Sequence, residues 1–231
     1  MSPLRYIRYR ETYKVRTYEV DSNKQITIPA LLTLMQETAM QQVIKMKVSL
    51  WDLEALNMSW VMMRMQLKIH RLPQLGEELI ITTNPAGFEK LLTYRDYRVY
   101  DHNEKLIATA ASTWLMMDTQ KRRMTRIPEY ILEYTPPPDH PLLPRPLNKL
   151  PLIETPFTEK KHWEVNWHDL DFNEHLSNVN YIKWIVETME DEYLRKRQLK
   201  QLDLIFRAES LWKDEVLGLI QATEEHTFRH R

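Results

Sequence analysis

The chain contains an internal repeat whose two copies lie 150 positions apart. The later copy centres on Asp171-Phe172-Asn173-Glu174-His175, and Asp21 and Asn23 stand at the matching positions of the earlier copy. The same alignment, without a gap, pairs Tyr13 with Trp163, Val15 with Val165, Leu32 with Ile182, Met35 with Ile185 and Glu37 with Glu187. Self-similarity at a fixed offset indicates a repeated structural unit. The chain should therefore fold as two copies of one small unit.

The two copies differ at one polar position of the motif, where Gln25 stands in the first copy and His175 in the second. A histidine titrates near neutral pH and can transfer protons, whereas a glutamine cannot. We therefore predict one potential active site, in the second half of a duplicated fold.

Composition excludes several classes of protein. The chain has no cysteine, which excludes disulfides, thiolate metal ligands and a cysteine nucleophile. Three scattered glycines argue against phosphate-binding loops and against the nucleophile elbow of serine hydrolases. The 32 basic and 32 acidic residues balance, so net charge gives no reason to expect nucleic acid as a partner. No apolar run approaches the roughly 18 residues of a membrane span, and the N-terminus lacks a signal-like apolar stretch. We expect a cytoplasmic protein without an integral membrane segment.

Prolines divide the chain into two halves. Seven of the 13 prolines lie between Pro136 and Pro151, in a segment without glycine. Such a segment favours an extended, stiff connector. We therefore expect an N-terminal repeat over 1–135, a linker over 136–151 and a C-terminal repeat over 152–231.

The hydrophobic pattern predicts the same order of elements in both halves. In the first half we expect a strand over 11–20, a helix from Thr27 and Pro29 to about Met46, and strands over 61–71, 78–84, 91–100 and 105–117. In the second we expect a strand over 161–167, a helix from Ser177 or Asn178 to about Arg197, and strands over 204–211, 215–222 and 226–231. The second copy lacks the last strand, and we expect that it is truncated at its C-terminus, because an unpaired strand edge is a liability.

A long apolar helix must lie against the sheet that its neighbouring strands form. The predicted fold class is therefore α+β, a double hot-dog with two tandem repeats, each an antiparallel sheet wrapped around a long helix.

Three stretches resemble the acyl-acyl-carrier-protein thioesterases of plant plastids and bacteria. The most specific stretch is 169–182, which contains Asp171, Asn173 and His175; the others are 95–101 with 111–118, and 206–210. The resemblance implies that Asp171, Asn173 and His175 are catalytic, with Glu209 as their carboxylate partner on the facing strand. Plant relatives often have cysteine where this chain has Ser210, so a cysteine nucleophile cannot operate here. Ser210 either positions a water molecule or is a small residue in a strand.

The residue types agree with thioester hydrolysis, which needs a base to activate water and donors to stabilise the oxyanion. The base is either Glu209 or Asp171; Asn173 would fix the geometry, and His175 would donate a hydrogen bond or a proton. The N-terminus of the following helix would offer free N–H groups to the carbonyl oxygen. Trp60, Met62, Met63 and Met65 are expected to line an acyl tunnel in the first half, since methionine adapts to flexible chains.

Other interpretations remain. An Asp-x-Asn-x-His run before a helix often only stabilises a turn and caps the helix. Asp21 and Asn23 in the first copy should have this purely structural role. His168, Asp169, Asp171 and His175 are a weaker set of metal ligands, and we expect neither metal nor cofactor.

For the function we expect hydrolysis of acyl-acyl-carrier-protein, releasing free fatty acid and terminating chain elongation. The alternatives are a hot-dog thioesterase or hydratase acting on coenzyme A esters, or a non-catalytic acyl-binding module. Acyl carrier protein is the expected partner of a monomer or homodimer. Basic clusters at 5–16, 121–126 and 195–200 are solvated faces or docking patches for this acidic carrier.

Overall fold

The computed structural model describes residues 8–156 and 159–231. The predicted basic cluster at 5–16 therefore begins outside the described residues, and the N-terminal stretch 1–6, in which the sequence shows no signal-like apolar run, lies outside them.

The first half contains the predicted strand, long helix and four further strands. Its elements are β1 (Tyr9–Lys14), α1 (Ile28–Lys45), β2 (Met58–Ile69), β3 (Glu78–Glu89), β4 (Leu92–Asp101) and β5 (Leu106–Asp118). Short additions that the pattern did not predict are the 3-10 turn η1 (Thr17–Glu19), α2 (Leu50–Glu54), β6 (Arg123–Met124) and α3 (Glu129–Leu132). The start of α1 is as predicted: the Thr27 side chain accepts a hydrogen bond from the Ala30 backbone, and Pro29 lies in the first turn.

The second half contains η2 (Trp167–Asp169) and repeats the order with β7 (Glu159–Glu164), α4 (Asn178–Glu187), α5 (Asp191–Lys196), β8 (Gln201–Ile205), β9 (Glu215–Glu224) and β10 (Thr227–His230). The prediction of one helix reaching Arg197 is wrong, because the helix ends after Glu187 and a short one begins at Asp191. At the break, the Thr188 hydroxyl donates to the Ile185 carbonyl at 2.7 Å, and Glu190 has extended backbone angles. A side chain that binds a nearby carbonyl in this way competes with the helical hydrogen bonds.

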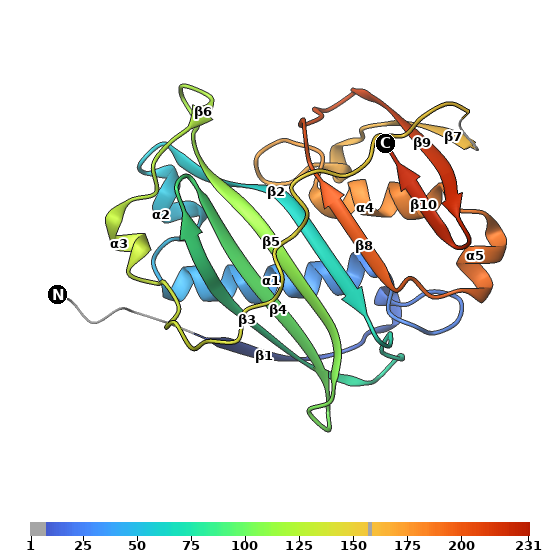
Figure 1. The fold of residues 1–231 in the computed structure, drawn as a ribbon, viewed down its shortest axis with the longest axis horizontal. Coiled ribbons are helices and arrows are strands. Elements are labelled where there is room, and N and C mark those ends of the chain that lie inside the picture. Colours follow the sequence, from blue (N-terminus) through green and yellow to red (C-terminus); the bar gives the residue numbers. More distant parts are fainter. Residues whose placement is uncertain (1–7, 157–158) are drawn as a thin grey trace.

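The strands form two antiparallel sheets (Figure 1). The larger has the order β1-β3-β4-β5-β2-β8, with β6 paired to β5, and the smaller has the order β10-β9-β7. Strand β8 belongs to the second half by sequence, yet it pairs with β2 of the first half. The halves are therefore joined by a shared sheet as well as by the chain.

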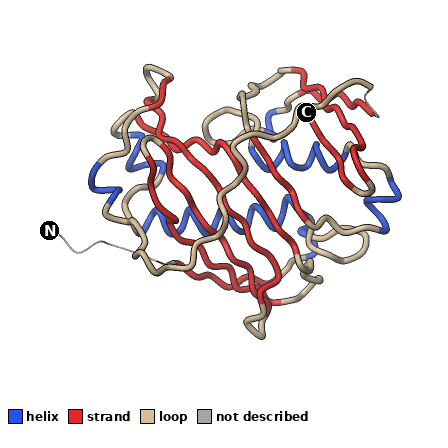
Figure 2. Tube along the Cα trace, viewed as in Figure 1, coloured by secondary structure: helices blue, strands red, loops and turns tan. Residues whose placement is uncertain are grey.

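Both long helices pack against the strands, and α1 lies behind the large sheet in the view of Figure 2. The main core joins the inner face of this sheet to α1, with Leu31, Leu32 and Met35 buried at its centre. Ile182 of α4 and Leu204 of β8 belong to the same cluster. Because apolar burial is the main favourable contribution to folding, the two halves stabilise each other through one continuous core.

The second half packs its helix differently from the first. Trp163 on β7 stacks on Trp184 of α4, with ring centroids 5.3 Å apart and an interplanar angle of 2°. The strand registers place Gly218 where the first half has Ile81, since Lys161 faces Gly218 as Glu11 faces Ile81. A Cβ atom on Gly218 would lie 2.5 Å from Cζ3 of Trp163. The missing side chain of Gly218 therefore makes the space that the larger Trp163 ring occupies.

The proline-rich segment lies across the outer face of the large sheet, where Figure 1 draws it in yellow. The Leu143 N–H donates to the buried Asp96 carboxylate at 2.8 Å, and Arg98 donates to the Pro141 carbonyl. The Arg145 guanidinium lies 4.0 Å from the centre of the Tyr94 ring. These contacts anchor the segment to β4.

None of the helices in residues 8–156 and 159–231 is long and apolar enough to cross a membrane.

Candidate active site

The two copies of the motif fold into the same turn. In the first copy, Oδ1 of Asp21 accepts the backbone N–H groups of Asn23 at 2.8 Å and Gln25 at 3.0 Å. In the second copy, Oδ1 of Asp171 accepts those of Asn173 at 2.8 Å and His175 at 3.3 Å. Such carboxylate-to-backbone bonds fix a turn wherever they occur. The repeated aspartate is thus a local structural residue in both halves.

The turns also agree in backbone conformation. Lys24 and Glu174, at matching positions, both have positive φ angles, 60° and 63°. A hydroxyl then caps the helix in each half: Thr27 accepts from Ala30, and Ser177 accepts from Asn180, both at 3.2 Å. Turn and helix start are therefore one unit that the sequence repeats.

The copies differ in what faces the turn. The Ile26 N–H donates to the Pro73 carbonyl, and the matching Leu176 N–H donates to the Ser210 carbonyl. This correspondence places Glu209 where the first half has Leu72. Leu72 is buried in the main core, so the first half has an apolar side chain where the second has a carboxylate.

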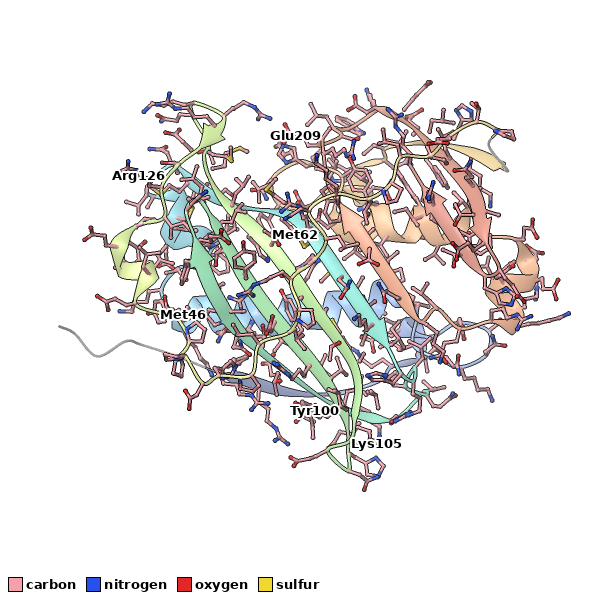
Figure 3. The ribbon with its side chains drawn as sticks, viewed as in Figure 1. Met46, Met62, Tyr100, Lys105, Arg126 and Glu209 are labelled. Atoms are coloured by element: carbon pink, nitrogen blue, oxygen red, sulfur yellow. The ribbon has the colours of Figure 1, made fainter. Side chains whose placement is uncertain are left out.

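His175 and Glu209 come together, as predicted. Nε2 of His175 lies 3.3 Å from Oε2 of Glu209, and their side chains are 28% and 39% exposed. The other carboxylate oxygen, Oε1, forms an ion pair with Arg122 of the first half. Figure 3 shows Glu209 near the β5–β6 hairpin, which carries Arg122. The sequence prediction placed Arg122 in a basic cluster and missed its contact with Glu209, because residues 87 positions apart carry no joint signal in one sequence.

The expectation that Glu209 lies on a facing strand is wrong, since β8 ends at Ile205 and residues 206–210 form an irregular segment. Ser210 is likewise outside the strands. The segment is nevertheless well anchored: the Phe206 N–H donates to the Met63 carbonyl at 2.9 Å, and the Tyr181 hydroxyl donates to Oγ of Ser210 at 2.8 Å. Tyr181, which was not predicted as a site residue, ties this segment to the first turn of α4.

The asparagines of the two motifs have different surroundings. The amide of Asn23 donates to the Arg195 carbonyl at 3.3 Å and so joins the first turn to the second half. The Asn173 side chain makes no hydrogen bond to any other residue that the structure describes, and it is partly exposed. Its amide is therefore available to a ligand. The helix α4 begins at Asn178, and the unpaired N–H groups of a helix N-terminus favour negative charge.

The four predicted tunnel residues lie on β2 and do not share one surface. Met62 and Met65 are buried in the main core, whereas Trp60 packs in a separate cluster with Met46 and Val48. A register shift between Met62 and Arg64 turns Met62 and Met65 to the same side. Figure 3 shows Met62 on the strand adjacent to β8, between the centre of the large sheet and the second half. Two surface cavities of about 420 and 340 Å³ lie elsewhere, near Arg10 and near Arg145.

Within the described ranges, no group of three or more histidine, aspartate or glutamate residues is arranged to hold a metal ion. His168 is exposed, and the Asp169 carboxylate accepts the Asn166 backbone N–H at 2.9 Å. His175, which pairs with Glu209, lies in a short stretch, 173–178, that also contains the Asn173 amide and the start of α4. These groups can activate water and stabilise an oxyanion.

Comparison with known proteins identifies relatives of both halves. The family described as acyl-ACP thioesterase N-terminal domain matches residues 7–135, and the family described as acyl-ACP thioesterase C-terminal domain matches residues 154–230. A chloroplastic palmitoyl-acyl carrier protein thioesterase of Cuphea hookeriana is 29% identical over 213 residues, covering 87% of this chain and 51% of its own length. A chloroplastic oleoyl-acyl carrier protein thioesterase of Arabidopsis thaliana is 29% identical over 232 residues, covering 94% of this chain and 63% of its own length. The chain thus spans between half and two thirds of these relatives.

Solved structures show the same fold. An acyl-ACP thioesterase from Bacteroides thetaiotaomicron superposes with a TM-score of 0.87 at 19% identity, covering 96% of this chain and 90% of that one. The 12:0-ACP thioesterase from Umbellularia californica superposes with a TM-score of 0.82 at 20% identity, covering 94% and 88%. The predicted double hot-dog fold is therefore confirmed.

Proposed function

The chain belongs to the acyl-ACP thioesterase family, and we propose that it hydrolyses the thioester of acyl-acyl-carrier-protein and thereby ends fatty-acid elongation by releasing free fatty acid. One observation carries this proposal. The histidine–carboxylate pair of His175 and Glu209 occurs beside a turn that both halves share, and the first half has Gln25 and Leu72 instead. The same turn forms in both halves, with and without this pair. The turn therefore does not require the pair, which we assign to catalysis.

In the proposed reaction, Glu209 accepts a proton from a water molecule whose oxygen attacks the thioester carbonyl carbon. The carbonyl oxygen becomes negatively charged, and the Asn173 amide and the N-terminus of α4 stabilise it. The carbon–sulfur bond then breaks, and the proton passes through His175 to the thiolate of the carrier. The products are a free fatty acid and the carrier thiol. Of the two carboxylates considered for the base, Glu209 is favoured, because Oδ1 of Asp171 is engaged by two backbone N–H groups.

We place the acyl chain in the first half, along the inner face of β2. Met62 and Met65 face α1 there, and the Phe206 N–H bonds to the strand at Met63 close to the segment that carries Glu209. Flexible methionine side chains can rearrange around an acyl chain at little cost.

The proposal is tested by thiol release from acyl-acyl-carrier-protein and from coenzyme A esters of the same acyl chain. We expect hydrolysis of both thioesters and a higher kcat/KM for the carrier thioester. The reason is that the exposed basic residues at 121–126 complement an acidic carrier surface. Glu209→Leu, which introduces the residue of the first half, is the matched inactive control. Absence of thiol release from every thioester, with the chain folded, would contradict the proposal and favour an acyl-binding module.

The repeat provides a paired test of Asp171. Asp21→Ala and Asp171→Ala each remove two equivalent backbone hydrogen bonds, so each should lower the free energy of unfolding by about 1 kcal/mol. Only Asp171→Ala should also lower kcat, because it loosens the turn that holds His175. Urea denaturation and thiol release measure the two effects. Equal activity of the two variants would show that the second turn has no special role in turnover.

A further inference from the structure

The site includes a charged group that belongs to the first half. Arg122 lies between β5 and β6, immediately before Arg123, and its guanidinium pairs with Oε1 of Glu209. The opposite oxygen, Oε2, faces His175. The carboxylate is thus held between a permanent cation and an imidazole, each on its own oxygen. The three residues come from three separate parts of the chain.

Glu209 depends on such contacts for its orientation. It lies in the irregular segment that follows β8, and its side chain is 39% exposed. Among the described residues, the partners of its carboxylate are Arg122 and His175. A freely rotating glutamate at this position would spend much of its time away from His175, and misplacement of a catalytic group by about 1 Å can lower the rate about 10²-fold.

The hairpin that carries Arg122 is built to hold its position. Oδ1 of Asp118 accepts the backbone N–H groups of Gln120 at 3.1 Å and Lys121 at 2.8 Å. The Gln120 amide donates to Oδ1 of Asn57 at 3.1 Å, and the Thr119 N–H donates to the Asn57 carbonyl at 2.9 Å. Arg122 itself has a positive φ of 49°. These hydrogen bonds therefore hold the backbone that carries Arg122 in place, although the Arg122 side chain is 63% exposed.

We propose that Arg122 is a positioning residue for the reaction: it binds one oxygen of Glu209 and leaves the other oxygen directed at His175 and the attacking water. The inference rests on the proposed function. Its consequence is that the site is assembled from both halves, and that the first half contributes to the chemistry as well as to acyl binding. An arginine holds a carboxylate by directional, charge-assisted hydrogen bonds.

Arg122→Gln tests the proposal, with Arg122→Lys as the conservative variant. In Arg122→Gln we expect kcat to fall about 10- to 100-fold, because Glu209 loses the contact that orients its carboxylate. Arg122→Lys should recover part of the rate, because a lysine can still pair with the Glu209 carboxylate. Arg123→Gln is the matched comparison, since it removes an equal charge from the adjacent exposed position of the same basic cluster. Arg123 is not among the described partners of Glu209, so its loss should raise the KM for the carrier and should not lower kcat.

Each variant is assayed with acyl-acyl-carrier-protein and with the corresponding coenzyme A ester. A similar loss of kcat with both thioesters supports a positioning role. An increase confined to the KM for the carrier, equal in Arg122→Gln and Arg123→Gln, would overturn it in favour of simple docking. A wild-type kcat in Arg122→Gln would also overturn it while leaving the proposed function intact. Failure of the proposed function would appear separately, as a wild-type protein without thiol release.

Discussion

His175→Gln is expected to fold like the wild-type chain and to lose about 10²- to 10⁴-fold in kcat, the range typical of removing a general acid or base. The first half supplies the reason to expect normal folding. Gln25 occupies the same position of the same turn, and its backbone N–H makes the same bond to Oδ1 of Asp21 that His175 makes to Asp171. The substitution therefore removes the imidazole beside Glu209 and keeps a residue that the turn accepts. Thiol release measures kcat, and urea denaturation measures stability.

Two further variants test whether His175 acts together with Glu209. Gln25→His should create no second site, because Leu72 stands where a carboxylate would be needed. Combining His175→Gln with Glu209→Leu should cost little more than either change alone, since groups that act as a unit are strongly non-additive. If His175→Gln kept full turnover, the histidine would be a structural residue and the carboxylate would have to act without it.

Gly218→Ala is expected to have the largest effect on stability, lowering the free energy of unfolding by about 1–3 kcal/mol through overpacking. The new Cβ would lie 2.5 Å from Cζ3 of Trp163 and 3.2 Å from Cγ2 of Thr188. Trp163 cannot easily move away, because its ring is stacked on Trp184 of α4. Relief therefore requires the stack or the strand to shift. Thermal and urea denaturation measure the loss.

The first half indicates how this strain can be relieved. It has Tyr13 and Ile81 at the positions of Trp163 and Gly218, so a smaller ring accompanies a larger strand residue. Trp163→Tyr should therefore recover part of the stability lost in Gly218→Ala, although it costs stability in the wild-type background. Additive losses in the double variant would mean that the two positions do not interact, contrary to the packing described above.

The elements of the first half followed closely from the sequence, and the exceptions have local causes. The expected strand over 11–20 ends at Lys14, because residues 17–19 form a 3-10 turn. Strand β3 extends past the predicted end to Glu89, through a register shift between Pro85 and Gly87. The break between α4 and α5 was not predicted, because Thr188 and Glu190 do not interrupt the apolar periodicity. Thr188 is the C-cap of α4, and its hydroxyl donates to the Ile185 carbonyl.

The site was predicted unevenly. The turn from Asp171 to His175 is local, and its geometry could be predicted from the residue types and from the matching motif around Asp21 in the first copy. The contact of His175 with Glu209 was expected from the resemblance to a family, and the structure brings the two within 3.3 Å. The contact of Arg122 with Glu209 was not predicted, although both residues were singled out for other reasons.

The sequence by itself determined the duplication, the two turns and helix starts, and the asymmetry between Gln25 and His175. These features depend on hydrogen bonds and periodicity within a few residues, so short stretches of sequence are enough to specify them. Only the tertiary structure decided that β8 joins β2 and that Arg122 reaches Glu209. Both contacts join residues far apart in the chain, and they depend on how the sheet pairs and how the two halves share one core. That arrangement is a property of the whole fold, which no single segment encodes.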